Sequence, residues 1–163
     1  MAVVLLTGMS GAGKSTVLAE LARAGHAVLD TDVGGWIERV PVPGGSEHEP
    51  LWRADRITAL LDAHGGGHLF LAGTVANQGR FYARFDAVVL LSAPVDVLLA
   101  RMSTRTDNPF GRTAAERAEI ARDVAAVEPL LRPGATVEID TRRPVDEVVD
   151  AVLAVAHACG ASG

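Results

Sequence analysis

The feature that most constrains this 163-residue chain is the segment Gly8-Met9-Ser10-Gly11-Ala12-Gly13-Lys14-Ser15, which lies between an apolar run and a segment with helical spacing. The pattern G-x-x-x-x-G-K-S, after a strand and before a helix, is typical of a phosphate-binding loop. Glycines let successive backbone N–H groups curl round an anion, and the following helix points its N-terminus at the same anion. The segment therefore predicts a nucleotide site.

Single positions of this loop have separate expected roles. Lys14 is expected to reach the β- and γ-phosphates, and Ser15 to give one oxygen to Mg²⁺. Lys14 is the only lysine among 15 basic residues, which fits a position where a planar guanidinium would fit badly. A glycine-rich turn with a chance lysine is the alternative, and the flanking strand and helix patterns argue against it. The expected nucleotide contacts of the loop are Gly8, Ser10, Gly11, Ala12, Gly13, Lys14, Ser15 and Thr16.

Apolar runs of strand length recur along the chain and alternate with segments of helical spacing. This alternation predicts one domain over residues 1–163, a three-layer α/β P-loop fold in which helices cover both faces of a five-stranded parallel sheet. Ligands of such sheets bind at the carboxyl ends of the strands. The expected strands cover residues 3–6, 26–29, 68–72, 87–91 and 136–139.

Two aspartates follow the second predicted strand, in Asp30-Thr31-Asp32. Carboxylates at this edge could hold the water shell of Mg²⁺, and Asp32 could position an attacking hydroxyl or take its proton. Residues two apart in an extended segment share one face, which favours a joint role. The alternative is a plain turn in which Asp32 caps a short helix over residues 33–39.

The candidate acceptor contacts lie in two further segments. Residues 40–50 are rich in proline and glycine, which predicts a loop, and we expect a mobile substrate region over about residues 40–64. Arg53 is the candidate acceptor contact there, with a solvated surface position as the alternative. Gly73 and Thr74 follow the third predicted strand and suit either a polar ligand or a helix start capped by Thr74.

A third segment breaks the helical pattern that begins at Pro94. Turn-forming residues occupy positions 106–111, with Arg105 and Arg112 on either side. An arginine-flanked segment here predicts a lid over about residues 105–113, whose guanidinium groups neutralise charge on a transferring phosphate and help to exclude water. The alternative is an ordinary turn between helices.

Composition limits the partners. The net charge of −5 argues against a broad nucleic-acid-binding surface, and 4% aromatic residues offer few stacking platforms. The single cysteine, Cys159, and the absence of signal-like or membrane-spanning runs predict a cytoplasmic protein with no membrane partner. We expect a small-molecule acceptor, and the oligomeric state stays open.

The chain from about residue 2 to 156 resembles the small P-loop kinases of the nucleoside-monophosphate-kinase superfamily, and most of all the shikimate kinases. Their D-[ST]-D and the I-E pair after it match Asp30-Thr31-Asp32 and Ile37-Glu38, and their F-R is similar to Trp52-Arg53. The resemblance implies that Arg101 enters the lid and stacks on adenine. It also implies that Arg143-Pro144, the nearest match to an R-x-P motif, closes the other side of the base.

The resemblance is weaker on the acceptor side. The shikimate kinases carry G-G-G where this chain has Ala72-Gly73-Thr74, and the lid over residues 108–112 does not read R-P-L-L. Their R-x-P-L-Y motif, whose arginine holds the substrate carboxylate, aligns with residues 127–131, which begin with Val127. Valine cannot make that charge-assisted bond, which argues against shikimate as the acceptor.

Together these patterns predict an ATP-dependent phosphotransferase that moves the γ-phosphate of Mg·ATP to a hydroxyl or phosphate group of a small molecule. The predicted catalytic residues are Lys14, Asp32, Arg105 and Arg112. The predicted Mg²⁺ ligands are Ser15, Asp30 and Asp32. The predicted acceptor contacts are Asp32, Arg53, Gly73 and Thr74.

Three other functions compete with this prediction. A GTPase is suggested by residues 32–35, which fit D-x-x-G, but the guanine-reading N-K-x-D element needs a second lysine. A kinase of nucleic-acid ends conflicts with the net charge. A non-catalytic or ATPase-type nucleotide-binding protein that acts through a partner is the third, and turnover with an acceptor would eliminate it.

Overall fold

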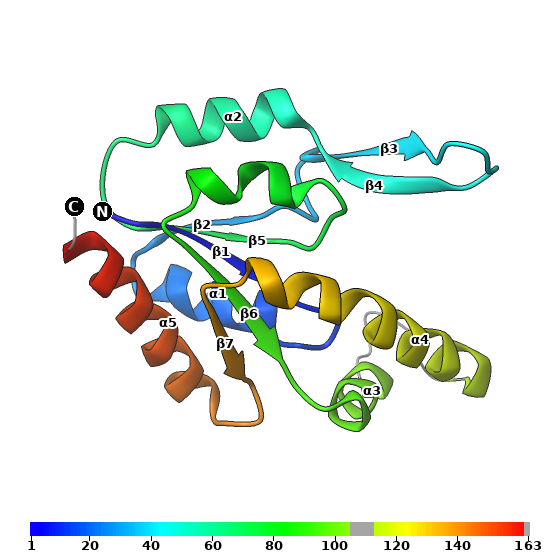
Figure 1. Cartoon of the computed structure of the whole chain (residues 1–163). Helices are drawn as coiled ribbons and strands as arrows, with labels where there is room; N and C mark the ends of the chain where they lie inside the picture. Colours follow the sequence, from blue (N-terminus) through cyan, green and yellow to red (C-terminus); the bar gives the residue numbers. More distant parts are fainter. Residues whose placement is uncertain (105–112, 162–163) are drawn as a thin grey trace.

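The computed structural model of this chain describes residues 1–104 and 113–161. A five-stranded parallel sheet runs through its centre, in the order β2-β5-β1-β6-β7 (Figure 1). All five predicted strands are present within one residue of their expected limits, which confirms the predicted α/β fold. The strands are β1 (Val3–Thr7), β2 (Ala27–Asp30), β5 (Leu69–Ala72), β6 (Ala87–Ser92) and β7 (Val137–Asp140).

Helices cover both faces of this sheet (Figure 1). One face carries α1 (Lys14–Arg23) and α5 (Val145–Ala161), and the other carries α2 (Ala54–Ala63) and the 3-10 helix η1 (Gln78–Arg84). Beyond the carboxyl end of β6, two further helices pack against each other, and a short 3-10 helix connects the second of them to β7. These are α3 (Val95–Ser103), α4 (Ala114–Leu131) and η2 (Arg132–Gly134).

Successive residues of β1 enter two separate cores. Val4 and Leu6 pack with α1 and α5, whereas Leu5 packs with the α2 residue Ile57 and with η1. All four side chains are fully buried. Because a parallel sheet with helices on both faces buries every residue of its inner strands, such strands read as continuous apolar runs, and each buried side chain stabilises the fold by about 1.5–3 kcal/mol.

The start of α4 is fixed by its own sequence. The Thr113 hydroxyl accepts the Glu116 N–H, and the Glu116 carboxylate accepts the Thr113 N–H, both at 3.1 Å. This reciprocal capping box satisfies two backbone donors that a helix start leaves without partners.

The largest departure from the sequence expectations is a β-hairpin between Asp32 and Arg53. It consists of β3 (Ile37–Pro41) and β4 (His48–Trp52), paired antiparallel, and it projects from the body of the molecule (Figure 1). The alternative helix over residues 33–39 is therefore wrong, and the expected loop over residues 40–50 is present only at residues 42–47, between the two strands. Proline lacks an N–H, which a two-stranded ribbon with two outer edges tolerates, so Pro41 and Pro50 do not prevent pairing.

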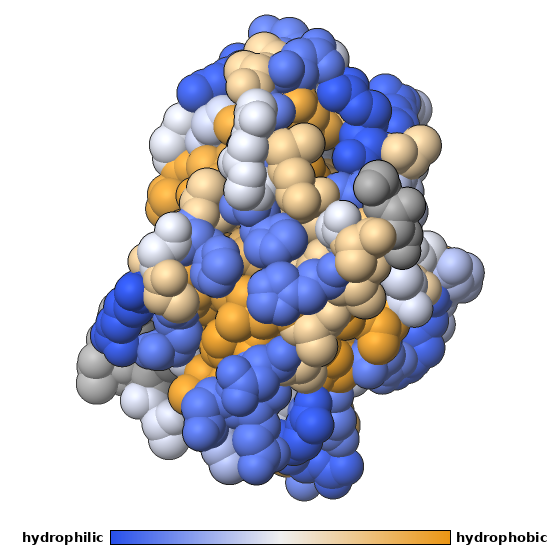
Figure 2. Space-filling model, turned by 90° about the vertical axis from the view of Figure 1, so that its left-hand side faces the viewer, coloured by the Kyte–Doolittle hydropathy of each residue, from blue (hydrophilic) through white to orange (hydrophobic). Residues whose placement is uncertain are grey.

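The end of the molecule that carries both chain termini lies opposite the carboxyl ends of the strands, and hydrophilic side chains are interspersed there with hydrophobic ones (Figure 2). The imidazole of His68 lies there with its ring centre 6.0 Å from that of His26 and 5.2 Å from that of His157. Its Nδ1 accepts the Ala2 N–H at 3.1 Å, so this histidine helps to hold the start of the chain. Within the described ranges, no helix is long and apolar enough to cross a membrane.

Candidate nucleotide-binding and phosphotransfer site

The phosphate-binding loop leaves β1 at Gly8 and reaches α1 at Gly13. Gly8 has a φ of 150°, and a Cβ atom at this position would overlap the carbonyl oxygen of Leu91. Gly13 precedes the first residue of α1 with a φ of 104°, and no side chain caps that helix. The first backbone N–H groups of α1 therefore have no side-chain acceptor, which is the arrangement that binds a phosphate at a helix start.

Lys14 is the first residue of α1, and its ammonium turns back over the loop. It donates to the carbonyl of Gly8 and, at 3.3 Å, to that of Met9. Burial lowers the pKa of Lys14 from 10.5 to about 8, while the nearby carboxylates of Asp32 and Asp30 act in the opposite direction. The group thus keeps its charge at neutral pH and is ready to bind an anion.

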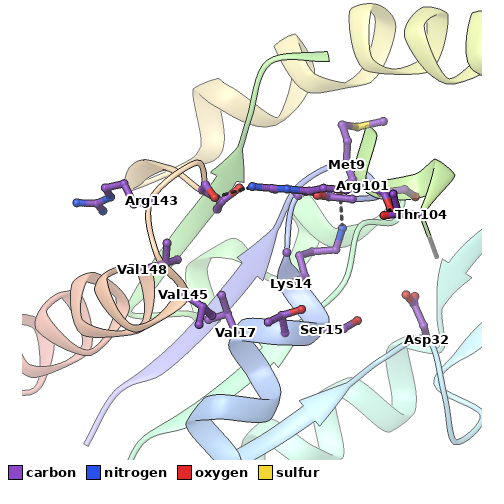
Figure 3. A pocket seen from close by; sticks show the side chains of 16 residues that line it. Met9, Lys14, Ser15, Val17, Asp32, Arg101, Thr104, Arg143, Val145 and Val148 are labelled. Atoms are coloured by element: carbon purple, nitrogen blue, oxygen red, sulfur yellow. Dashed lines mark hydrogen bonds between the residues drawn. The ribbon is translucent and has the colours of Figure 1, made fainter. Parts of the chain in front are cut away.

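A cavity of about 640 Å³ lies along this loop (Figure 3). One end is polar and includes Lys14, Ser15 and Asp32, whereas Val17, Val145 and Val148 give the other end an apolar wall. A nucleotide has the same division between charged phosphates and a flat base, so the cavity matches its chemistry. The lining residues are Met9, Ser10, Gly11, Ala12, Gly13, Lys14, Ser15, Thr16, Val17, Asp32, Arg101, Thr104, Thr141, Arg143, Val145 and Val148.

The guanidinium of Arg101 connects the phosphate-binding loop to the segment after β7. It donates to the Gly11 carbonyl at 3.0 Å, to the Thr141 hydroxyl at 2.9 Å and to the Thr141 carbonyl at 2.6 Å. Thr141 is itself held by the Ser92 carbonyl at 3.2 Å. Because these bonds occupy the edge of the planar group, its face remains the surface that a base could contact.

The two aspartates after β2 do not occupy equivalent places. Asp32 lines the cavity, whereas Asp30 does not. The carboxylate of Asp30 instead accepts the backbone N–H of Asp32 at 3.0 Å. Partial burial raises the pKa of Asp32, the charge of Asp30 raises it further, and the Lys14 ammonium opposes both. Asp30 therefore orients the residue that faces the cavity.

The three remaining acceptor candidates lie outside the cavity lining. Arg53 is exposed just before α2, and its backbone N–H donates to the Trp36 carbonyl at 2.8 Å. Gly73 packs so tightly that a Cβ atom there would overlap the hydroxyl of Thr31. Thr74 does not cap a helix, because η1 begins at Gln78, and that alternative is wrong. Its hydroxyl bonds to both backbone groups of Gly8 instead.

Neutral polar groups near Gly73 pair with one another. The hydroxyl of Thr31 donates to the Ala72 carbonyl at 2.8 Å and accepts the indole N–H of Trp52 at 3.0 Å. Asn77 accepts the Trp52 backbone N–H at 2.9 Å and donates to its carbonyl at 3.0 Å. These bonds attach the base of the β3–β4 hairpin to the edge of the sheet.

The predicted loop contacts from Ser10 to Thr16 all line the cavity, together with Arg101, Arg143 and Asp32, whereas Gly8 and Pro144 do not. Arg105 and Arg112 lie outside the described residues, so the lid stays a prediction. Residues that the site prediction missed also line the cavity. Val148 belongs to the hydrophobic core as well as to the cavity wall, and only the spacing of Val145 and Val148 at a helix start offers a sequence signal. The missed residues are Met9, Val17, Thr104, Thr141, Val145 and Val148.

A strand, phosphate-binding loop and helix at the carboxyl edge of this parallel sheet, with a cavity that extends to the segment after β7, define a P-loop nucleotide-binding protein. A family model described as an AAA domain matches residues 4–122. The chain is 36% identical to a shikimate kinase of Rhodopseudomonas palustris, over 94% of this chain and 80% of that protein. The chain therefore belongs to the family of P-loop kinases that includes the shikimate kinases.

Solved structures agree on the fold. A shikimate kinase from Acinetobacter baumannii in complex with shikimate superposes with a TM-score of 0.62, at 20% identity, over 94% of this chain and 91% of that one. A gluconokinase from Sinorhizobium meliloti 1021 gives a TM-score of 0.59 at 18% identity, over 96% and 91%. Kinases with two differently named acceptors thus share this architecture.

Proposed function

We propose that this protein transfers the γ-phosphate of Mg·ATP to a hydroxyl or phosphate group of a small molecule other than shikimate. One observation carries the proposal: the Lys14 ammonium and the Asp32 carboxylate line the polar end of the same cavity, beside the start of α1. Phosphoryl transfer needs a cation for the phosphate oxygens and a carboxylate for the attacking hydroxyl, and here both lie at one edge of the sheet.

Lys14 and the loop N–H groups would hold the β- and γ-phosphates. The hydroxyl of Ser15 and the carboxylate of Asp32 fit Mg²⁺, which prefers oxygen ligands and usually takes one or two carboxylates with phosphates and water. Within the described residues, no three His, Cys, Asp or Glu side chains converge as metal ligands, so phosphate and water oxygens would complete the shell. Mg²⁺ bound there would neutralise phosphate charge.

Asp32 would also orient the acceptor hydroxyl and accept its proton. A raised pKa brings this carboxylate closer to working pH, which makes it a better base than an ordinary aspartate. Arg105 and Arg112 would close over the transferring group and stabilise the charge that develops on it. Arg53, exposed at the start of α2, would contact the acceptor from the hairpin side.

The acceptor proposal depends on residues 127 and 128. Val127 occupies the position at which the shikimate kinase motif has its carboxylate-binding arginine. The next residue, Glu128, is buried and pairs with Arg132 at 2.7 Å. Neither Val127 nor Glu128 is cationic, so a substrate carboxylate at that position would lack a charged partner, which is costly. We therefore expect shikimate to be a poor substrate, although the relatives are named for it.

The test is ADP release from Mg·ATP with nucleosides, nucleoside monophosphates, shikimate, gluconate and neutral polyols, with Lys14→Ala as the blank. Acceptor-dependent release above the blank, largest for an acceptor other than shikimate, would support the proposal. Shikimate as the best acceptor would overturn its acceptor part. Nucleotide binding without release for any acceptor would overturn the transfer reaction and favour a partner-dependent nucleotide-binding protein.

A further inference from the structure

A chain of buried and partly buried hydrogen bonds runs from η1 to the first glycine of the phosphate-binding loop. The side-chain amide of Gln78 donates to the Thr7 hydroxyl at 3.0 Å, and the hydroxyls of Thr7 and Thr74 lie 3.0 Å apart. The Thr74 hydroxyl donates to the Gly8 carbonyl at 2.6 Å and accepts the Gly8 N–H at 3.1 Å. Both backbone groups of Gly8 are therefore held by one side chain from the end of β5.

The number of hydrogens fixes the direction of this chain of bonds. A threonine hydroxyl carries one hydrogen, and that of Thr74 points to the Gly8 carbonyl, so Thr7 must donate to Thr74. Thr7 then accepts from Gln78, whose other amide hydrogen goes to the Tyr82 hydroxyl at 2.8 Å. The amide oxygen of Gln78 accepts the Val75 N–H at 2.9 Å, which fixes the orientation of the amide. The series of donors thus runs from Gln78 through Thr7 and Thr74 to the Gly8 carbonyl.

The Gly8 carbonyl accepts hydrogen bonds from both the Thr74 hydroxyl and the Lys14 ammonium. A phosphate that binds the Lys14 ammonium draws it away from this carbonyl. A partly buried carbonyl without a donor is unfavourable, and the Thr74 hydroxyl prevents that loss. Gly8 lies close to the Leu91 backbone, where an added Cβ atom would overlap the carbonyl oxygen, so the Gly8 peptide has little space in which to rotate.

We infer that Thr74 is a positioning residue for phosphate binding. It holds the Gly8 peptide in place and keeps its carbonyl bonded when Lys14 moves to a phosphate. The shikimate kinase motif has glycine at the corresponding position, so the hydroxyl is a feature of this chain. The inference rests on the proposed function in one respect, that the phosphate belongs to a nucleotide.

The test measures the dissociation constants of ADP and AMP for wild type, Thr74→Val and Thr74→Ser, with melting temperatures recorded beside them. Thr74→Val keeps the shape of the side chain and removes the hydroxyl, and Thr74→Ser restores it. We expect Thr74→Val to weaken ADP about tenfold, to weaken AMP, which lacks the β-phosphate, by less than threefold, and Thr74→Ser to recover wild-type affinity. Ten-fold corresponds to about 1.4 kcal/mol.

The matched control is Thr136→Val, which removes a hydroxyl that accepts the Val88 N–H at 3.0 Å at the amino end of β6. It should leave both affinities unchanged. Equal ADP affinity in wild type and Thr74→Val, an equal loss for AMP, or an equal loss in Thr136→Val would overturn the inference. Should Thr74→Val not fold, Thr74→Ala takes its place. A wild-type protein that binds neither ADP nor ATP would overturn the proposed function as well.

Discussion

The proposed nucleotide side and the proposed acceptor side of the phosphate-binding loop are built in different ways. On the nucleotide side, Lys14, Ser15 and Arg143 present their side chains to one cavity. On the acceptor side, the side chains of Thr31 and Asn77 form hydrogen bonds with Trp52, and the Thr31 hydroxyl also bonds to the end of β5. The side chains of the first group face a cavity that a ligand can enter, whereas the polar groups of the second are already hydrogen-bonded within the protein. Polar residues at the carboxyl end of a strand are thus not by themselves evidence of a ligand.

The difference extends to the backbone. In the loop and the start of α1, the backbone geometry explains the glycines and the lysine of one local sequence pattern. The acceptor side depends instead on a hairpin whose two strands pair with each other. Its strands join the body at Trp52, which is buried and opposite Ile37. Variants on the two sides should therefore fail differently, either by losing the phosphate or by losing the acceptor and stability.

The largest effect is expected at Lys14. Lys14→Ala removes the ammonium from the polar end of the cavity. The rate of phosphate transfer should fall by about a thousandfold, at the upper end of the effect of removing one preorganised donor from a transition state. The far-ultraviolet circular dichroism spectrum should be unchanged, because Lys14 lies outside both cores. A lost folded signal would mean that this lysine has a structural role, and the two sides would no longer differ as described.

The next effect is expected at Asp32. Asp32→Asn should lower kcat about a hundredfold, because the amide is not a base, and should change the ADP dissociation constant only a few-fold. The matched control is Asp62→Asn, at an exposed carboxylate paired with Arg84 at 2.6 Å, which should leave both constants unchanged. A loss of ADP affinity as large as the loss in kcat would show that Asp32 acts through nucleotide binding and not on the acceptor hydroxyl.

Gly73→Ala tests the packing of the acceptor side. The added methyl would overlap the Thr31 hydroxyl and lie 3.3 Å from the Trp52 indole, so the free energy of unfolding should fall by about 1–3 kcal/mol. Urea denaturation measures it. Gly66→Ala is the control, since no atom lies within 4 Å of its added Cβ. Equal stability of the two variants would show that the Thr31–Trp52 contact is looser than described.

A smaller effect is expected from pH. The Lys14 pKa of about 8 lies below its unfolded value of 10.5, so the charge in the site is lost as pH rises through 8. ADP affinity should therefore fall by about tenfold between pH 7 and pH 9, whereas AMP affinity should change little. Calorimetric titrations at constant ionic strength measure both. A constant ADP affinity over this range would contradict the lowered pKa.

The smallest effect is expected from Val127→Arg. This variant restores the arginine of the shikimate kinase motif, but Glu128 beside it and Thr74 at the end of β5 remain. Shikimate-dependent ADP release should stay at the level of wild type. Appreciable turnover would show that the acceptor site of this chain differs from that of the shikimate kinases at one decisive residue. The acceptor side would then resemble that family as closely as the nucleotide side does.

The sequence was sufficient for the sheet and for the phosphate-binding loop, because both follow from local patterns. Buried parallel strands are continuous apolar runs, and the loop needs particular residues at particular positions. The hairpin was not predictable, because Pro41 and Pro50 discourage strands in general and are tolerated only at free edges. The partners of Thr74 were not predictable either, since the pairing of β1 with β5 brings Thr7 and Gly8 beside it.

Because Lys14 is the only lysine of the chain, proteolysis can measure local opening of the phosphate-binding loop. A protease specific for lysine has a single cleavage site in these 163 residues, and it lies at the first residue of α1. Cleavage there requires local unfolding of the helix start, so the rate of one proteolytic reaction reports the population of that open form. A ligand that closes the loop should slow this reaction in proportion to its occupancy.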